Sequence, residues 1–373
     1  MAGHGLMAVR SPAVPVRHHK GGTMNFTKRS KAAVVGATAL AVGLGLTAGA
    51  GSSTAAAGPA SAHPTSLTNF ADPGFSMFTT ATGAKRFYLY ATGPGFRAAA
   101  STTPKASGFA GKGPSMSDQP GWVIDSGDRG LWAPSVFRVK SDGKWLYVMY
   151  FVGRDGRTGS PTKGKSCIGI ATSASPTDNF RPTNQKTPFL CPRTGMNEAI
   201  DPSMFRDADG KRYLVYKVGN YTTRRFEIRA KPMDSATGLR DAGASFLLTD
   251  AAHHDFRGSS KNVIEAPQVI RRGNKLWLFT SRGGYKDCEY STFAYSSTSI
   301  RGGRWNFGSA VMTPANSTFC GPGGAEVVND GGTYRIAFHV WKNGIPKSKS
   351  ADATRQTWVG TLKWDSSGNP HMA

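Results

Sequence analysis

A segment of about sixty residues recurs along this chain, and it constrains the fold more than any other feature. Each copy opens on an X-Pro step before a short apolar strand, passes through a turn and ends on an aromatic-rich strand. The prolines of the first four copies are Pro73, Pro134, Pro202 and Pro267, spaced by 61, 68 and 65 residues, and a weaker fifth copy begins at Gly324. Self-similarity at such a period is typical of repeat architectures.

The repeat predicts an all-β fold. An X-Pro step suits the start of a strand, where no ladder donor is needed, and the turn after it closes a hairpin. Further strand candidates follow the hairpins, for example at 167–172 and 226–230. Units of about four strands that cannot bury their faces alone pack radially into a β-propeller, so five units predict a five-bladed β-propeller. A β-sandwich with coincidental spacing is the alternative.

The first 62 residues are predicted to be a signal peptide and leader, with a start at Met24 as an option. A basic stretch and then a Gly- and Ala-rich apolar run lead to Ala60-Ser61-Ala62, an A-x-A cleavage candidate. Because that run is only weakly hydrophobic, we expect no membrane anchor. Residues 63–373 are then the catalytic domain of a secreted, extracellular protein that is not attached to a membrane.

Basic residues greatly outnumber acidic ones. The formal charge is +23, and because the leader holds six Lys or Arg and no acid, the predicted domain keeps +17. Such a charge attracts acidic polymers such as pectin or cell-wall polyanions, although it can also serve solubility alone. The basic residues are scattered and no nucleic-acid-binding motif is present, so nucleic acid is not an expected partner.

The cysteines are predicted to form disulfide bonds. All four follow the leader, and an even number in an exported chain favours disulfides, with three pairings open. We favour Cys167–Cys191 and Cys288–Cys320, because each pair closes a loop inside or between neighbouring repeats. No C-x-x-C pair exists, which argues against a structural zinc site.

Three repeats carry an acidic residue at the start of their first strand: Asp72, Asp201 and Glu265. In a propeller the first strands line the central channel, so these carboxylates would converge on one pocket. Desolvation of a carboxyl among apolar neighbours favours its protonated form, which a general acid near neutral pH needs. The alternative for either aspartate is a simple Asp-Pro turn cap. Glu326, in the fifth repeat, is expected to be structural.

Five motifs in this order resemble glycoside hydrolase family 43: Asp72-Pro73, Trp132-Ala133-Pro134, Ile200-Asp201-Pro202-Ser203, Glu265-Ala266-Pro267 and Cys320-Gly321-Pro322-Gly323. The resemblance covers nearly all of the chain after the leader. It implies a five-bladed β-propeller that hydrolyses arabinose- or xylose-containing plant polysaccharides with inversion. It also implies that Asp72 is the general base and Glu265 the general acid, with Asp201 orienting the acid and keeping it protonated. The base and acid of an inverting enzyme lie about 6.5–9.5 Å apart.

The resemblance further implies an ion near His339, which ends the aromatic strand of the fifth repeat. In arabinanase-like members of the family, a histidine at the propeller axis holds calcium or sodium, largely through waters. A buried histidine satisfied by the backbone is the alternative, and the chemistry itself requires no cofactor. The chain departs from the family pattern at Gly324 and Ser135, where the family has His and Asp, which bears on the metal surroundings and on substrate contacts.

Residues beside the strand mouths are predicted to contact the sugar. Trp132 and Tyr285 are the first candidates, with Phe75 and Arg282 behind them. Aromatic rings stack on the apolar faces of sugars, although ordinary packing between repeats is the alternative for each residue.

The expected function is a secreted inverting glycoside hydrolase that acts on α-L-arabinofuranosyl linkages of arabinan or arabinoxylan. A β-xylosidase on the same scaffold is the nearest alternative, and a non-catalytic polysaccharide-binding propeller is the alternative from another class. The expected partner is the polysaccharide, and the expected state is a monomer. Exo or endo action depends on loops such as 93–121 and 251–261, whose conformation the sequence leaves open.

Overall fold

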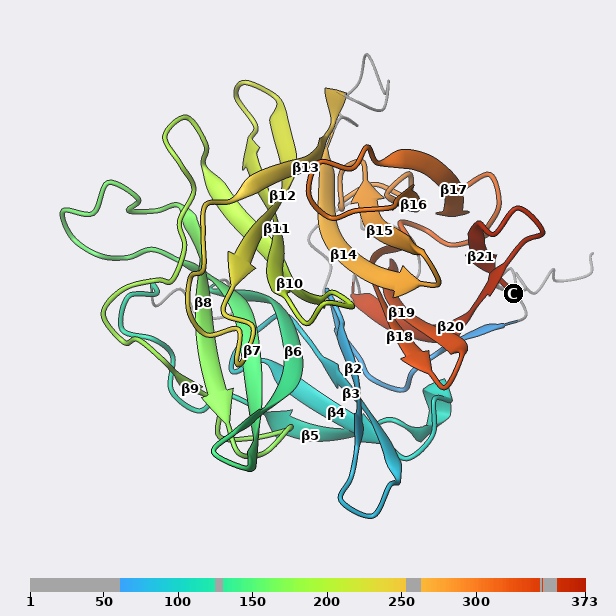
Figure 1. Cartoon of the computed structure of the whole chain (residues 1–373), viewed down its shortest axis with the longest axis horizontal. Coiled ribbons are helices and arrows are strands. Elements are labelled where there is room, and N and C mark those ends of the chain that lie inside the picture. The colour runs from blue at the N-terminus through green and yellow to red at the C-terminus, as the bar shows by residue number, and fades with distance from the viewer. Residues whose placement is uncertain (1–60, 125–129, 253–262, 343, 345–353) are drawn as a thin grey trace, which may run out of the picture. The chain divides into compact units, whose positions relative to one another are not determined.

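The computed structural model describes residues 61–124, 130–252, 263–342, 344 and 354–373, which fall within the unit Ala55–Ala373. Strands account for nearly all of its regular structure, and one 3-10 turn, Ala106–Gly108, is the exception in this part of the chain (Figure 1). The all-β prediction is therefore confirmed. The predicted leader up to residue 60 and most of the loop 251–261 lie outside the described residues.

The strands form four hydrogen-bonded sheets in the described part of the chain. The simplest is an antiparallel run of four: β2 (Gly74–Thr79), β3 (Lys85–Tyr90), β4 (Arg97–Ser101) and β5 (Ala110–Pro114). Another such run consists of β14 (Ile264–Arg272), β15 (Lys275–Arg282), β16 (Ser291–Ser297) and β17 (Asn306–Met312).

The eight-stranded sheet consists of two runs, which a single parallel pair between Ser166 and Glu198 joins. One run contains β6 (Leu131–Ser141), β7 (Lys144–Arg154), β8 (Ser166–Ser173) and β9 (Arg181–Pro182). The other contains β10 (Glu198–Arg206), β11 (Arg212–Asn220), β12 (Arg225–Met233) and β13 (Phe246–Asp250).

The last sheet draws on both ends of the described chain. It contains β18 (Gly323–Asp330), β19 (Thr333–Trp341) and β20 (Arg355–Trp364), with β21 (Pro370–Met372) beside β20. The first strand, β1 (Ala62–Pro64), pairs antiparallel with β20 and so fastens the start of the described chain to its last run.

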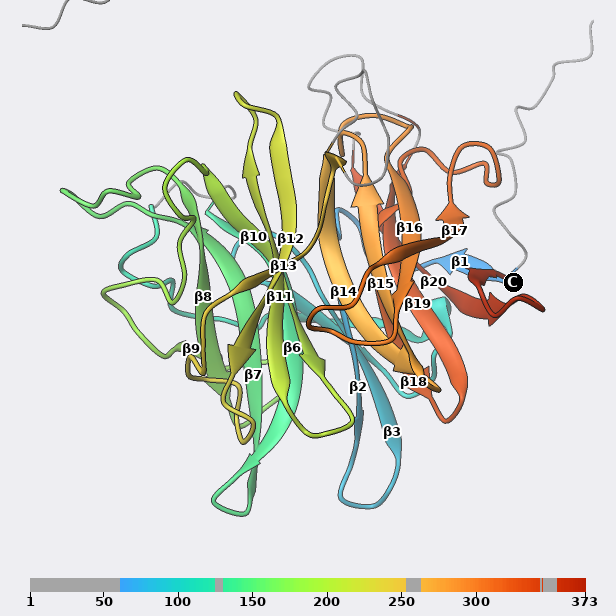
Figure 2. The same cartoon turned by 45° about the horizontal axis from the view of Figure 1, so that its top comes forward.

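The first strands of the runs meet one another in cyclic order. β2 contacts β6, β6 contacts β10, β10 contacts β14, β14 contacts β18, and β18 contacts β2 (Figure 1). The apolar core lies between neighbouring runs, as where Phe205 of β10 shares a cluster with Leu278 of β15. In Figure 2 the β2–β3 and β6–β7 hairpin turns project to the same side. The opposite ends of the first strands, where the X-Pro steps lie, therefore gather around one centre.

Each X-Pro step forms a distinct backbone feature. The ladder register shifts across Trp132/Ser135, Ile200/Ser203, Glu265/Gln268 and Gly323/Glu326. The residue inside each irregularity has a positive φ, as does the residue at the equivalent place before β2; these residues are Asp72, Ala133, Asp201, Ala266 and Gly324, with φ from 46° to 61°. A left-handed conformation costs free energy in a residue with a side chain, and such strain concentrates at functional sites.

The backbone N–H at four of these bulge positions is satisfied by a side chain of the preceding run. The pairs are Ala133 N–H to Thr92 Oγ1 (3.0 Å), Ala266 N–H to Asp201 Oδ2 (2.9 Å), Gly324 N–H to Ser281 Oγ (2.8 Å) and Asp72 N–H to His339 Nδ1 (3.1 Å). Because a buried unpaired donor is costly, these bonds hold neighbouring runs in register around the centre. Of these four bonds, the one to His339 connects the last run to the first.

Both predicted disulfides are confirmed: Cys167 pairs with Cys191, and Cys288 pairs with Cys320. The first lies within the run that begins at β6, and the second joins the loop after β15 to the loop before β18. Among the described residues, no helix is long and apolar enough to cross a bilayer.

Candidate active site

A cavity of about 600 Å³ opens where the bulges of the first strands converge. Its lining includes residues from every one of the described runs, and all three predicted catalytic carboxylates are among them: Asp72, Asp201 and Glu265. The predicted convergence of these groups on one pocket is therefore observed. The three carboxylates are expected to occupy the same position in their repeats, and one of them does not. Asp72 and Asp201 occupy the positive-φ position of their runs, whereas Glu265 precedes that position by one residue.

Asp72 is held as a carboxylate. Arg355 Nη1 donates to its Oδ1 at 2.6 Å, and Thr92 Oγ1 donates to its Oδ2 at 2.7 Å. Burial works to raise the pKa of Asp72, but the positive charge of Arg355 and these hydrogen bonds outweigh burial and leave the pKa below its ordinary value. An ionised carboxylate can accept a proton from water, which is the task of a general base.

The pKa of Asp201 is shifted in the opposite direction to that of Asp72. Its burial, together with the negative charge of neighbouring Glu265, raises the pKa of Asp201 to about 8. Asp201 Oδ2 also accepts the N–H of Ala266, so this carboxyl is tied to the residue that follows Glu265. Because neighbouring like charges resist joint ionisation, the Asp201–Glu265 pair retains a proton at neutral pH.

Glu265 forms an ion pair with a lysine that was not among the predicted site residues. Lys217 Nζ lies 2.7 Å from Glu265 Oε2 and 2.7 Å from Glu198 Oε1, and the lysine side chain is fully buried. Glu198 also lines the cavity. The only sequence signal for Lys217 is a charged residue in the middle of β11, between apolar neighbours, and every residue of this strand is buried.

Tyr290 lines the cavity beside all three carboxylates. Burial, and then the charges of Glu265 and Asp201, raise the pKa of its phenol well above the ordinary value. The Tyr290 ring stacks on His339 with centroids 6.0 Å apart. Gly323 makes room for this ring, because a Cβ at that position would lie 2.0 Å from Tyr290 Cε1.

His339 is fully buried behind Asp72 and Tyr290. Burial and the charge of Arg355 lower its pKa to about 3, so the imidazole is neutral at pH 7. Since Nδ1 accepts the Asp72 N–H, the ring proton is on Nε2, an atom without a hydrogen-bond partner among the described residues. A protonated ring nitrogen cannot ligate a cation, but it can donate to a water that does. The predicted ion near His339 thus fits only in water-mediated form, and it stays a prediction.

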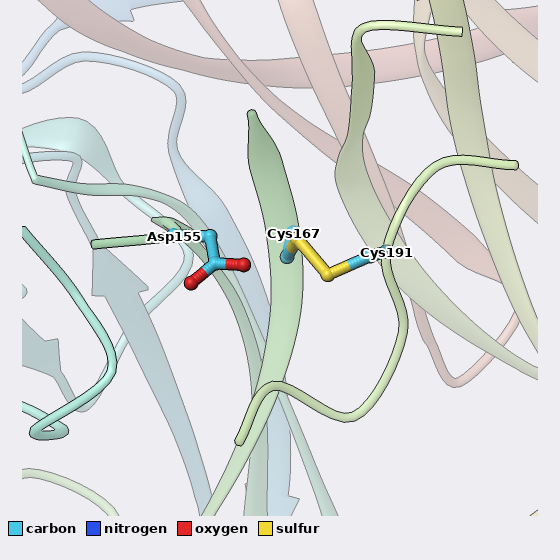
Figure 3. A group of neighbouring side chains, drawn as sticks. All are labelled: Asp155, Cys167 and Cys191. Atoms are coloured by element: carbon cyan, nitrogen blue, oxygen red, sulfur yellow. A yellow bond between two sulfur atoms is a disulfide. The ribbon is translucent and has the colours of Figure 1, made fainter. Parts of the chain in front are cut away.

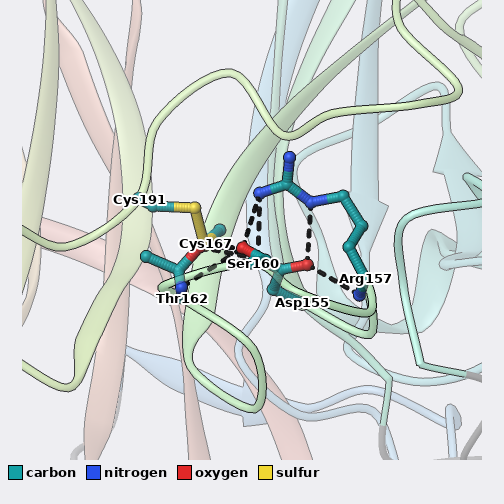
Figure 4. The surroundings of a disulfide bond; sticks show 6 residues. All are labelled: Asp155, Arg157, Ser160, Thr162, Cys167 and Cys191. Atoms are coloured by element: carbon teal, nitrogen blue, oxygen red, sulfur yellow. Dashed lines mark hydrogen bonds and ion pairs between the residues drawn. A yellow bond between two sulfur atoms is a disulfide. The ribbon is translucent and has the colours of Figure 1, made fainter.

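One further group has potential metal-ligand atoms in the described part of the chain: Asp155, Cys167 and Cys191 (Figure 3). The two sulfurs are bonded to each other, so no thiolate is available. The Asp155 carboxylate accepts hydrogen bonds from Arg157, Ser160 and Thr162 (Figure 4). Burial opposes ionisation of Asp155, but these bonds lower its pKa. The group stabilises the loop after β7 and has no open coordination position for a metal.

The four predicted sugar contacts divide into two pairs. Trp132 and Tyr285 line the cavity, and Tyr285 is 41% exposed at its edge. Phe75 instead lies in the core, where it packs against Phe87 and Phe109. Arg282 is buried under the ring of Tyr295, outside the cavity lining. The prediction of sugar contact is thus wrong for Phe75 and Arg282, because a strand alternates its faces and these side chains lie on the packed one.

The cavity lining also includes residues that sequence reasoning did not select, namely Arg154, Glu198, Tyr221, Tyr290, Glu326 and Arg355. Tyr221 is 53% exposed and offers an aromatic surface to a ligand. Glu326 accepts the Phe75 N–H at 2.6 Å, and burial raises its pKa to about 8, so it is largely protonated at pH 7. Glu326, which we expected to be structural, thus combines a bond to the first run with a place in the pocket.

Comparison with known proteins identifies relatives of this chain. The family model "Glycosyl hydrolases family 43" matches residues 70–370. An extracellular endo-alpha-(1->5)-L-arabinanase 1 of Bacillus subtilis (strain 168) is 27% identical over 230 residues, which are 58% of this chain and 64% of that protein. The match therefore spans less than two thirds of that relative's length.

Two solved structures show the same fold. A thermostable family-43 glycoside hydrolase has a TM-score of 0.63 and 21% identity, with coverage of 83% of this chain and 94% of its own. A xylan beta-1,4-xylosidase from Bacillus halodurans C-125 has a TM-score of 0.60 and 17% identity, with coverage of 81% and 54%. At these identities the likeness concerns the architecture alone.

Proposed function

Because this chain belongs to glycosyl hydrolases family 43, a family of glycosidases that hydrolyse O-glycosyl bonds, we propose that it hydrolyses α-L-arabinofuranosyl linkages of arabinan or arabinoxylan with inversion. The observation that carries this proposal is the shared pocket of Asp72, Asp201 and Glu265, where the surroundings lower the pKa of Asp72 and raise that of Asp201. The arabinanase relative favours arabinose over xylose as the sugar.

The proposed roles follow from these surroundings. Asp72, which Arg355 keeps ionised, takes a proton from a water as the water attacks the anomeric carbon. Glu265 gives a proton to the departing glycosidic oxygen, and Asp201 holds a proton for that pair and orients the segment through the Ala266 N–H. The bond from the anomeric carbon to the leaving oxygen breaks, and its electrons stay on that oxygen. Trp132, Tyr221 and Tyr285 offer surfaces for the sugar rings.

We further propose that the architecture is a five-bladed β-propeller. The eight-stranded sheet then counts as two blades, because one parallel pair alone joins its two antiparallel runs in the described residues. The cyclic contacts of β2, β6, β10, β14 and β18 support this interpretation.

We also propose that the enzyme is secreted as a monomer after removal of the leader at residues 1–62. The two disulfides favour an oxidising compartment, and the arabinanase relative is named as extracellular. An ion held through water by His339 would stabilise the pocket floor; no step of the reaction depends on it.

The roles are tested with Asp72→Asn and Glu265→Gln, each of which is expected to lower kcat/KM on an α-L-arabinofuranosyl oligosaccharide, whose leaving group needs a proton, by about 10²–10⁴-fold. Asp118→Asn is the control, because Asp118 is exposed and outside the pocket lining. NMR of the first-formed product reports whether the anomeric configuration inverts. Wild-type activity in both variants would reject the assigned roles.

The substrate is tested separately with paired aryl α-L-arabinofuranoside and β-D-xyloside. Faster release from the arabinofuranoside supports the proposal, and faster release from the xyloside favours the β-xylosidase alternative. No release from either, together with retained binding to polysaccharide, favours the non-catalytic alternative. A polysaccharide digest resolved by chain length then distinguishes endo from exo action.

A further inference from the structure

A fully buried lysine is bound to two glutamates beside the pocket. Lys217 lies on β11 opposite Ile200, the residue before Asp201. Its side chain has no exposed surface, and its Nζ lies 2.7 Å from both Glu265 Oε2 and Glu198 Oε1. A buried ammonium loses its hydration, which costs several kcal/mol unless close partners compensate. The side-chain oxygens of Glu265 and Glu198 at this distance provide that compensation.

Aromatic groups complete the surroundings of the ammonium. Nζ lies 3.3 Å from the Tyr221 hydroxyl, and it is 5.2 and 5.3 Å from the ring centroids of Tyr221 and Phe226. Burial alone lowers the pKa of Lys217, but the charges of Glu265 and Glu198 outweigh burial and raise it well above the ordinary value. Lys217 is therefore a fixed positive charge at any pH at which the enzyme works.

The contact to Glu265 involves one carboxyl oxygen and leaves the other for the reaction. Because Lys217 contacts Oε2, Oε1 is the oxygen open to deliver a proton to the leaving group. When Oε1 gives this proton to the glycosidic oxygen, Glu265 becomes a carboxylate, and the ammonium at 2.7 Å stabilises the new negative charge. Glu198 holds the ammonium from the other side, at the pocket wall.

We propose that Lys217 is a positioning residue for Glu265, with Glu198 as its second anchor. This inference rests on the proposed function, in which Glu265 is the general acid. Lys217 acts through Glu265, because the lysine itself does not line the cavity. The alternative is a purely structural role, in which Lys217 only connects β11 to β14. The two roles predict different results when Lys217 is replaced: the fall in kcat depends on the leaving group only if the lysine acts through Glu265.

The test compares leaving groups in Lys217→Met. A 2,4-dinitrophenyl glycoside needs little protonation on departure, whereas an alkyl glycoside or an oligosaccharide depends fully on the acid. With the preferred sugar, we expect kcat to fall by less than about tenfold for the dinitrophenyl glycoside and by about 10²-fold or more for the oligosaccharide, within the range of acid catalysis. Lys217→Arg is expected to restore part of the oligosaccharide activity.

Three controls isolate this effect. Lys231→Met removes an ion-paired lysine of the same run outside the pocket lining, and its activity should match the wild type for both substrates. Lys217→Met leaves the Glu198 charge unpaired, and that alone can unfold the variant. The double variant Lys217→Met/Glu198→Gln removes that charge together with the lysine, so it should fold if the unpaired charge is the only cause. If even this double variant fails to fold, Glu198→Gln alone is tested, and it should show a weaker form of the same dependence.

The outcomes separate this inference from the proposed function. The positioning role is overturned if the folded Lys217 variants lose kcat equally for both substrates. Where those variants do not fold, the same result in Glu198→Gln overturns it. Glu265→Gln must show the same dependence on the leaving group. If Glu265→Gln shows none, the assignment of Glu265 as the acid fails, and this inference fails with it. If Glu265→Gln shows it and the lysine variants do not, the inference alone fails.

Discussion

The guanidinium of Arg355 links the last run to the first through Asp72. It donates to Asp72 Oδ1 at 2.6 Å, and it also lies over the rings of Tyr285 and Trp341, at 5.3 and 5.9 Å. One side chain thus keeps Asp72, the proposed base, ionised and supports the aromatic edge of the pocket. The chemical state of Asp72 is set by a residue almost three hundred positions away in the sequence.

Arg355→Met is expected to lower kcat/KM most strongly at acidic pH. Without the guanidinium, burial raises the pKa of Asp72, so the carboxylate is lost as the pH falls through a higher value than in the wild type. A hydrogen bond to a charged group contributes about 1.5–3 kcal/mol, which corresponds to a tenfold or larger loss. A pH profile of kcat/KM measures the shift, with Lys140→Met as a control for a lost positive charge away from the pocket. An unchanged acidic limb would contradict the role of Arg355.

The basic limb of the same profile reports the proton of the Asp201–Glu265 pair. Because the pKa of Asp201 is raised to about 8, the pair loses its proton above that pH, and kcat/KM is expected to fall by about tenfold per further pH unit. Glu326 also has a pKa raised to about 8, so Glu326→Gln is the necessary comparison. The basic limb should remain in Glu326→Gln and change in Asp201→Asn. The reverse pattern would assign the proton to Glu326.

At the scale of elements, the first strands approach one another too closely for ordinary side chains. Gly74, at the start of β2, lies against Pro134 of β6, where a Cβ would be 2.1 Å from the Pro134 carbonyl oxygen. Close approach brings the bulges together, and hydrogen bonds between runs then fix their register. The carboxylates can converge only because the backbones around the centre are this near.

Gly74→Ala is therefore expected to destabilise the fold by about 1–3 kcal/mol and to lower activity, since β2 must move away from β6 and takes the neighbouring Asp72 with it. Gly111→Ala is the matched control. Gly111 is also in a strand of the first run, but a Cβ there meets no atom within 4 Å and its φ is not positive. Denaturant unfolding and kcat/KM are measured for both. Equal stability of the two variants would show that the gap between β2 and β6 adapts without cost.

At the scale of the whole described unit, the last run includes the first strand. β1 pairs with β20, and Thr65 N–H and Oγ1 both donate to the Thr357 carbonyl oxygen at 3.0 Å. The same strand, β20, begins at Arg355. The pairing of β1 with β20 therefore also supports Arg355, which donates a hydrogen bond to Asp72.

A variant that begins at Leu67 is expected to be less stable by about 2–4 kcal/mol than one that begins at His63, the first residue after the proposed leader, because it loses the His63 and Pro64 part of β1 and the bonds of Thr65, at roughly 1 kcal/mol for each hydrogen bond. The reduced support of β20 should also lower kcat/KM. Denaturant unfolding and the aryl-glycoside assay measure the two effects. Identical unfolding curves would indicate that β1 contributes nothing to the closure.

The repeat, the all-β fold and the three carboxylates could be predicted from the residues alone, and the observed disulfide pairs were the favoured ones, because each depends on local pattern and spacing. Hydrophobic alternation, X-Pro steps and turn residues act over a few positions, and their recurrence places equivalent strand ends together. The family resemblance likewise depends on short motifs at those ends. Asp72, Asp201 and Glu265 could therefore be selected before the structure was known.

Which other side chains meet these carboxylates depends on how distant strands pack together. Lys217 and Arg355 come from strands whose local pattern indicates no function, and each contacts a carboxylate of a neighbouring run in the folded chain. The same packing turned Phe75 and Arg282 away from the pocket, since a shift of one residue along a strand exchanges its two faces. Charge and burial are properties of the assembled neighbours, so the protonation states of Asp72 and Asp201 exist only in the folded chain.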